Sequence, residues 1–293
     1  MTIVSRPAPA KLNLTLEVVG KRADGYHLLD SLVAFTAYGD TVEARPGSGL
    51  SLAMDGPFGT RLAGDTAENL VLRAARTLAE AAGVKADAAL HLTKRLPIAS
   101  GIGGGSSDAA AALLALAALW RIDPAPEDLA RLALTLGADV PVCLKHRPAR
   151  LQGIGDRVDP APILPAAPIL LVNPGIGLPT PSVFKARQGA FSAGAGAHGV
   201  LTEPPADVEA LALALRRHGN DLTQAAIGLL PAIAEILAAL EALPGCLLAR
   251  MSGSGATCFA LFRDAASAQA AEASLSTRHP GWWAVATRLQ SDG

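Results

Sequence analysis

The chain has 293 residues; half of them are hydrophobic, 4% are aromatic, and 25 basic side chains stand against 26 acidic ones. That length is enough for two ordinary domains or one large one, and the high apolar content argues against a disordered chain. The net charge of −1 provides no general attraction for nucleic acid or for an anionic membrane, so we expect neither as a partner.

The cysteines and the apolar segments of the sequence indicate the cellular compartment of the protein. Cys143, Cys246 and Cys258 fit no zinc spacing and predict buried free thiols in a reducing environment. The N-terminal segment MTIVSRPAPAK lacks the apolar core of a signal peptide, and the longest apolar run, 109–120, is too short to span a bilayer. We therefore expect a cytoplasmic protein.

The first half of the chain alternates strand and helix patterns. Apolar residues recur at every second position over 10–19, which predicts a strand, and Asp24-Gly25 predicts a turn into a second strand. An amphipathic pattern then predicts a helix over 66–82, capped by Thr66 and stopped by Gly83. The other elements expected in this half are a strand at 89–98 and helices at 106–119 and 126–136.

A proline- and glycine-rich stretch at 150–168 marks a domain boundary. We expect an N-terminal domain at 1–155 and a C-terminal domain at 156–293. The segment 188–205 is rich in small residues and predicts a long mobile surface loop, and Pro231 should kink or split a helix over 221–242. The remaining expected elements are strands at 169–174, 247–253 and 257–262, and helices at 206–217 and 265–278. The fold class that this order predicts is mixed α/β (α+β).

The most informative segment is PIASGIGGGSS at 97–107, which lies between a strand pattern and a helix pattern. Glycine removes the Cβ atoms that hold a ligand away, and unpaired N–H groups at a helix start favour phosphate. Ser106 and Ser107 could cap the helix or donate to an anion, and Asp108 should point away from it. The segment matches neither a Walker nor a Rossmann motif, so a tight strand–helix turn with an ordinary cap remains the alternative.

Six separate segments together point to a known family. PAPAKLNLTLEVVGKRADGYHLL, PIASGIGGGSSDAAAAL and RMSGSGATCFALF resemble the three motifs of the GHMP kinases. With GADVPVCL, NPGIGLPTPSVFK and GNDL added, the chain is similar to the 4-diphosphocytidyl-2-C-methyl-D-erythritol kinases of that superfamily. The resemblance runs in order from residue 6 to residue 262.

The resemblance implies a two-domain GHMP kinase fold with the active site in the interdomain cleft. It implies an enzyme that transfers the γ-phosphate of ATP to the 2-hydroxyl of a methylerythritol unit, in the non-mevalonate (MEP) route to isoprenoid precursors. The small-molecule substrate would be held by its cytidine diphosphate group. Mg2+ would accompany the nucleotide, and no metal-ligating residue of the chain is assigned.

The resemblance also implies roles for single residues. Lys11 and Asp139 match the family's catalytic pair, and Asn13 would contact the substrate. Tyr26 and His27 match a pair that recognises cytosine, with Phe184 on the other face of the base. The residues implied in ATP binding are Pro97, Ile98, Ala99, Ser100, Gly101, Ile102, Gly103, Gly104, Gly105, Ser106 and Ser107. Those implied in shaping the phosphate pocket are Ser252, Gly253, Ser254 and Gly255.

Without the resemblance, these residues have plainer interpretations. The strand pattern predicts Lys11 as a solvent-facing lysine, and Asp139 follows a helix end where an aspartate is commonly a turn residue or cap. The turn at 252–255 could simply join two strands. Asn220 and Asp221 are best interpreted as a helix N-cap.

Two other functions compete with this one. A homoserine or mevalonate kinase would share the fold, but the GYH segment with Phe184 argues for a cytidine-bearing substrate. A nucleotide-binding regulator would need neither Lys11 nor Asp139. The chain departs from the family at KHRPAR, where relatives more often have glycine, and at Val142 and Cys143, where aromatic residues are frequent.

Overall fold

The computed structural model describes residues 3–62, 69–196 and 199–291 of the chain. They form two compact units that interleave along the sequence. Unit 1 comprises Met1–Ala10, Gly39–Ile98 and Gly103–His146, and unit 2 comprises Lys11–Tyr38, Ala99–Ile102 and Arg147–Gly293. The division at residues 155 and 156 stays a prediction; the chain makes its last passage from unit 1 to unit 2 between His146 and Arg147.

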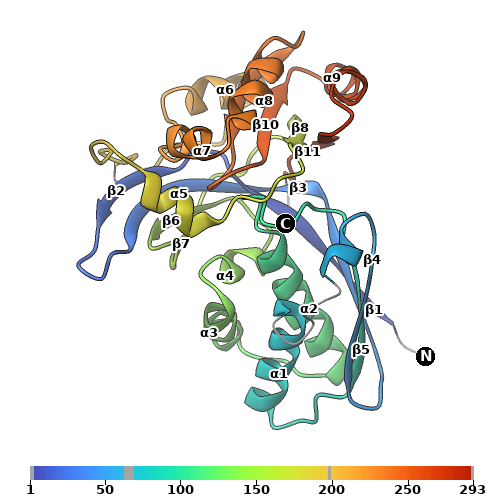
Figure 1. The fold of residues 1–293 in the computed structure, drawn as a ribbon. Coiled ribbons are helices and arrows are strands. Elements are labelled where there is room, and N and C mark those ends of the chain that lie inside the picture. The colour runs from blue at the N-terminus through green and yellow to red at the C-terminus, as the bar shows by residue number, and fades with distance from the viewer. Residues whose placement is uncertain (1–2, 63–68, 197–198, 292–293) are drawn as a thin grey trace. The chain divides into compact units, whose positions relative to one another are not determined.

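Unit 1 is a sheet with helices packed against it. Strand β5 (Ala88–Thr93) pairs parallel with β4 (Leu50–Asp55) and antiparallel with the second half of β3 (His27–Arg45). Helices α1 (Leu70–Ala82) and α2 (Gly104–Trp120) lie side by side (Figure 1). The other elements of this unit are η1 (Gly59–Leu62), α3 (Pro126–Leu136), α4 (Val140–Cys143) and the first part of β1 (Val4–Asn13).

The helix starts in unit 1 differ from those expected. Helix α1 begins at Leu70, and the Asn69 side chain accepts a hydrogen bond from the Val71 N–H at 2.9 Å, so Asn69 is the N-cap. Thr66, the expected cap, lies outside the described residues. Gly83 ends the helix with a left-handed φ of 65°, as predicted.

No side chain caps the start of helix α2. Gly103 is its N-cap, with a φ of 63°, and no side chain makes a capping hydrogen bond. The expected capping by Ser106 or Ser107 is therefore wrong, because both residues already lie in the helix. Most of the alanines and leucines of α2 are buried, which explains why its sequence has no polar face.

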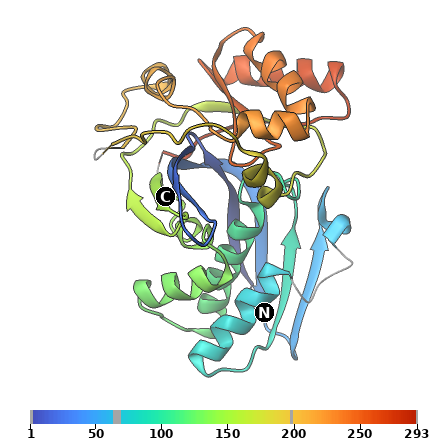
Figure 2. The ribbon, with the colours of Figure 1, turned by 60° about the vertical axis from the view of Figure 1, so that its left-hand side comes forward.

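Unit 2 contains a four-stranded antiparallel sheet in the order β11-β8-β10-β9. Its strands are β8 (Pro168–Asn173), β9 (Cys246–Met251), β10 (Cys258–Phe262) and β11 (Trp283–Arg288). Helices α8 (Ala232–Glu241) and α9 (Ala265–Arg278) bury side chains against this sheet in one apolar core (Figures 1 and 2).

Smaller elements complete unit 2. Strand β6 pairs with the first half of β3 and with β7, and β2 forms the expected hairpin with β3. These elements are β2 (Glu17–Lys21), β6 (Ala149–Gly153), β7 (Arg157–Pro160), α5 (Thr180–Ala186), α6 (Val208–Leu215) and α7 (Thr223–Leu229).

Several sequence predictions match these elements closely. Helices α3 and α9 have the predicted bounds, and the helix predicted over 221–242 is split at Pro231 into α7 and α8. The strand predicted over 10–19 is interrupted between β1 and β2. There the N–H groups of Leu14 and Thr15 both donate to the Leu32 carbonyl. Strand β11 was not expected.

Two further expectations concern the chain as a whole. Within the described part of the chain, no helix is long and apolar enough to cross a membrane. None of the three cysteines forms a disulfide; Cys143 and Cys258 are buried, as predicted, and Cys246 is half-buried.

The described residues of the loop at 188–205 form no helix or strand. The Ser192 N–H donates to the Val18 carbonyl at 2.9 Å, and the Ala195 N–H donates to Asp30 Oδ2 at 2.9 Å. Arg150 donates to the Gly196 carbonyl at 2.6 Å. The loop is therefore attached to β2, β3 and β6, and its mobility stays a prediction.

Candidate active site

The centre of the glycine-rich loop belongs to unit 2. The carbonyls of residues 99–102 accept, in order, from the N–H groups of Leu178 and Thr257, the Ser252 hydroxyl and the Lys11 N–H, at 2.9–3.1 Å. Four successive carbonyls are thus held by three segments of unit 2, since Ser252 and Thr257 belong to the same turn between β9 and β10. This packing explains the loop's unusual residues, because only a backbone without bulky side chains can approach so many partners.

The end of the loop belongs to unit 1 and opens α2. The Ser107 hydroxyl is buried and donates to the Pro9 carbonyl at 2.6 Å, so its proton is engaged within the fold. Ser106 is half-buried and Gly105 is exposed. With no side-chain cap on the first N–H groups of α2, this helix start has the backbone donors that suit an anion.

The second glycine turn is more than a link between β9 and β10. The Ser252 hydroxyl accepts from the Asn13 N–H at 3.0 Å and donates to the Gly101 carbonyl at 2.9 Å. A Cβ on Gly101 would lie 2.6 Å from the carbonyl oxygens of both Ser252 and Gly255. The turn therefore packs directly on the centre of the glycine-rich loop, which the sequence pattern left open.

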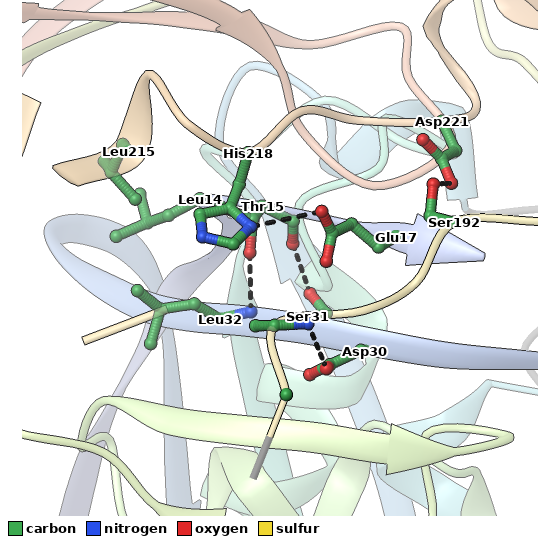
Figure 3. A network of polar contacts seen from close by, with 12 residues as sticks. Leu14, Thr15, Glu17, Asp30, Ser31, Leu32, Ser192, Leu215, His218 and Asp221 are labelled. Carbon is green, nitrogen blue, oxygen red and sulfur yellow. Dashed lines mark hydrogen bonds and ion pairs between the residues drawn. The ribbon is translucent and has the colours of Figure 1, made fainter. Parts of the chain in front are cut away.

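Neither Asn220 nor Asp221 is the N-cap of α7, although Asn220 Oδ1 accepts from the Leu222 N–H at 3.0 Å just before the helix. Helix α7 has Leu222 as its N-cap and no side-chain capping bond. The Asn220 amide donates to the carbonyls of Met251 and Gly253, both at 2.8 Å, and so holds the second glycine turn. Asp221 accepts from the Val18 N–H and from the Ser192 hydroxyl, both at 2.7 Å; Figure 3 shows the latter contact.

The two residues of the implied catalytic pair lie in different units. Lys11 is only 3% exposed, so the expectation of a solvent-facing lysine is wrong; its Nζ donates to Asn13 Oδ1 at 3.2 Å. Asp139 in unit 1 is half-buried at the start of α4 and makes no capping hydrogen bond with that helix. Asp139 stands at the N-cap position of α4 but does not cap the helix with its side chain.

The end of β1 is held by buried polar groups of unit 2. Asn13 Nδ2 donates to the Ser31 hydroxyl at 2.7 Å, and that hydroxyl donates to the Thr15 carbonyl at 2.5 Å (Figure 3). Arg250 donates to the Leu14 carbonyl at 2.6 Å, and burial lowers the pKa of Arg250 to about 10. Ser31 and Arg250 lie in or next to the motifs, but no role could be assigned to them from the sequence because their partners Asn13 and Leu14 lie 18 and 236 positions away.

The residues expected at the base are only partly brought together. The His27 and Phe184 rings are stacked, with centroids 5.2 Å apart and planes at 26°. Rings at this separation are already in contact, so no base fits between them. Tyr26, the neighbour of His27 in the chain, is 61% exposed, which leaves its ring available as a stacking face.

The charge state of His27 suits recognition of a neutral base edge. Burial lowers the pKa of His27, and the positive charges of Lys21 and Arg187 lower that pKa further. A neutral imidazole presents one N–H donor and one acceptor nitrogen, whereas the protonated ring presents donors alone. His27 can therefore both donate to and accept from a pyrimidine.

No protein-made metal cage is present in the described part of the chain: no group of three or more His, Cys, Asp or Glu side chains there could hold a metal ion. Mg2+ in phosphate-transfer sites is bound by few protein carboxylates and mainly by phosphates and water. The donor set thus fits a Mg2+ ion that enters with a nucleotide.

Comparison with family models and with known relatives identifies the family of the chain. The model of the GHMP kinases N terminal domain matches residues 69–147, and that of the GHMP kinases C terminal domain matches residues 206–281. A 4-diphosphocytidyl-2-C-methyl-D-erythritol kinase of Paramagnetospirillum magneticum is 55% identical over 99% of this chain and 100% of its own. One of Rhodospirillum rubrum is 56% identical over 99% of this chain and 93% of its own. The chain belongs to the 4-diphosphocytidyl-2-C-methyl-D-erythritol kinase family.

Solved structures separate this kinase family from others with the same fold. A crystal structure of a 4-(cytidine 5'-diphospho)-2C-methyl-D-erythritol kinase superposes with a TM-score of 0.80 at 37% identity, over 99% of both chains. A homoserine kinase from Cytophaga hutchinsonii gives 0.74 at 18% identity, over 100% of this chain and 96% of its own. The second likeness shows the two-domain GHMP fold alone, whereas the first agrees with the family in sequence as well.

Proposed function

We propose that this chain is the kinase that transfers the γ-phosphoryl group of ATP to the 2-hydroxyl of 4-diphosphocytidyl-2-C-methyl-D-erythritol. The observation that carries the proposal is the full-length identity of 55% and 56% to two kinases that bear this substrate's name. Its place would be the MEP route to isoprenoid precursors.

ATP is the co-substrate in this proposal, and its phosphates would meet residues 97–107. The N–H groups at the start of α2 would donate to phosphate oxygens, and the exposed Gly105 would let them approach the backbone. The second glycine turn would keep the centre of the loop in place through Ser252 and Gly255. Mg2+ held by the phosphates would neutralise their charge during transfer.

Asp139 and Lys11 would act at the transferring group. In a loose transition state the bond from the γ-phosphorus to the leaving oxygen of ADP is largely broken before the new bond to the 2-hydroxyl oxygen forms. The hydroxyl proton is therefore released late, and Asp139 would orient the hydroxyl and accept that proton. Lys11, kept in place by Asn13, would offset negative charge on the phosphoryl group.

The cytidine diphosphate group would be the handle of the substrate. Tyr26 and Phe184 would stack on the two faces of the cytosine, and neutral His27 would read its polar edge. Asn13 would add a polar contact to the methylerythritol unit.

ADP release in the presence of Mg2+ and ATP tests the proposed function. The panel contains the cytidine compound, the same polyol phosphate without cytidine, mevalonate and homoserine. Turnover confined to the cytidine compound supports the proposal. Turnover with mevalonate or homoserine would keep the fold and overturn the substrate, and ATP binding without any turnover would point to a regulator.

Replacing Tyr26 should weaken binding of the substrate without affecting ATP. Stacking of an aromatic side chain on a base is worth about 1–3 kcal/mol, so Tyr26→Ala should raise the KM for the cytidine compound about tenfold or more. Stability should change little because the side chain is 61% exposed. Steady-state kinetics with each substrate varied in turn makes the measurement.

Tyr26→Phe is the matched control, since it keeps the ring and should have nearly the KM of the unaltered protein. The polyol phosphate that lacks cytidine, tested as a competitive inhibitor, should bind equally weakly to the unaltered protein, Tyr26→Ala and Tyr26→Phe. An equal loss by Tyr26→Ala with that compound would contradict stacking.

A further inference from the structure

A buried cluster of charges lies beneath the start of α2, apart from the residues assigned to the site. Lys94 follows β5, Asp40 lies on β3, and Asp108 lies on α2; all three belong to unit 1. Lys94 Nζ donates to Asp40 Oδ2 and, at 2.6 Å, to Asp108 Oδ2. The three residues are 2–3% exposed, so solvent does not compensate their charges.

The cluster holds both ends of the glycine-rich loop. On the entering side, Asp40 Oδ1 accepts from the backbone N–H groups of Arg95 and Leu96. On the leaving side, Asp108 anchors α2, and a Cβ on Gly104 would lie 3.1 Å from Lys94 Nζ. The first turn of α2 therefore rests directly on the Lys94 ammonium.

The charges of the cluster do not balance if both carboxylates are ionised. One ammonium then faces two carboxylates, and Asp108 Oδ1 is buried with no hydrogen-bond partner. An uncompensated buried charge is costly, and it would lie beside the helix start that is expected to receive phosphate. A proton on Asp108 removes the excess charge.

We propose that Asp108 is a positioning residue for the phosphates of ATP: together with Lys94 and Asp40 it fixes the first turn of α2, and it does so as the neutral acid. The proposal rests on the kinase function proposed above, but it concerns nucleotide binding alone. Asp108 touches no substrate; it acts through the backbone of residues 104–107.

The electrostatics of the cluster agree with this assignment. Burial raises the pKa of Asp108 to about 7, the nearby Lys94 opposes that rise, and Asp40 adds to it. For Lys94, burial acts to lower its pKa, but the two carboxylates outweigh burial and raise it, so the ammonium stays charged. Lys94 and Asp40 are the charged groups that act on Asp108 from the neighbouring elements.

Binding of ATP should therefore depend on pH through Asp108. Below about pH 7 the cluster is neutral and the helix start can receive phosphate; above it, the ionised Asp108 repels the nucleotide. We expect the Kd for Mg-ATP to rise by up to about tenfold between about pH 6 and about pH 8. The nucleotide's own phosphate titrates in this range, so the comparison must be made against Asp108→Asn.

The variant Asp108→Asn keeps the shape of the neutral acid and cannot lose a proton. Calorimetric titration of the full chain with Mg-ATP, without the second substrate, should give a Kd that changes less with pH in this variant than in the unaltered protein. Identical pH profiles for the two proteins would overturn the proposal. Since no phosphoryl transfer is needed, this result is independent of whether the proposed substrate is correct.

Asp108→Ala and a control separate positioning from general stability. Asp108→Ala leaves α2 unanchored and should raise the KM for ATP about tenfold while the KM for the cytidine compound stays unchanged. Leu116→Ala removes a fully buried side chain from the same helix, about 12 Å further along its axis than Asp108, and should lower Tm without changing the KM for ATP. Equal effects of the two variants on that KM would mean that destabilisation alone is at work, and would overturn the proposal.

Stability offers a second readout. The folded protein keeps the Asp108 proton up to about pH 7, whereas an unfolded aspartate releases it near 3.8. The favourable contribution is thus present in acid and is lost as the pH rises from about 4 to about 7. Asp108→Asn should remove this component from the pH dependence of Tm, and an unchanged dependence would contradict the neutral acid.

Discussion

The variant Asp139→Asn should lower kcat by about 10²- to 10⁴-fold, the usual contribution of a positioned acid or base. The amide has the shape of the carboxylate but cannot accept the proton of the attacking hydroxyl. The KM for ATP should change little, because the substitution leaves the segment at 97–107 unaltered. Single-turnover measurement of ADP formation with saturating cytidine compound isolates the chemical step.

Asp128→Asn is the matched control, since it makes the same chemical change on the exposed surface of α3, where Asp128 pairs with Arg131. Its kcat should equal that of the unaltered protein. If Lys11 and Asp139 act as one unit, adding Lys11→Met to Asp139→Asn should cost much less than the two separate losses combined. Nearly normal turnover by Asp139→Asn would remove this residue from the mechanism.

The variant Gly101→Ala should have the largest effect on the fold of the site. Gly101 has a φ of 74°, and a Cβ there would lie 2.6 Å from two backbone oxygens of the second glycine turn. A left-handed backbone costs a non-glycine residue roughly 1–2 kcal/mol, and overpacking adds about 1–3 kcal/mol. We expect a lower Tm together with a loss of ATP binding, measured by thermal unfolding and by titration with Mg-ATP.

Gly105→Ala is the informative comparison, because the nearest atom to its Cβ would be Leu70 Cδ1 at 3.4 Å. Alanine in a helix is favoured over glycine by about 1 kcal/mol, so Tm should be kept or should rise. ATP binding should nevertheless weaken, since the added methyl group occupies the exposed start of α2. Unchanged ATP binding by Gly105→Ala would show that phosphate does not approach this glycine.

Local sequence signals were sufficient wherever a structure depends on a few neighbouring residues. Pro126 and Gly137 delimit α3, Asp264 caps α9 by accepting from the Ser267 N–H, and Pro231 separates α7 from α8. Such signals act within one helical turn. The family could likewise be predicted from the sequence, because its motifs are short contiguous segments.

Tertiary structure decided what the polar residues near those motifs do. Lys11 alternates with leucines as a surface lysine would, yet residues 8–13 of β1 are buried on both faces, and Lys11 is one of them. Ser107 donates to a carbonyl 98 positions away, Asp221 accepts from an N–H 203 positions away, and Ser252 accepts from one 239 positions away.

No window of sequence contains both partners of such a bond. The local pattern therefore assigned Ser107, Asn220 and Asp221 to helix caps, which are the most frequent local use of serine, asparagine and aspartate. The cluster of Lys94, Asp40 and Asp108 is invisible for the same reason, since its members come from three elements. Residue type and spacing identify the chemistry of this kinase, whereas burial and long-range hydrogen bonds decide which polar groups remain available for it.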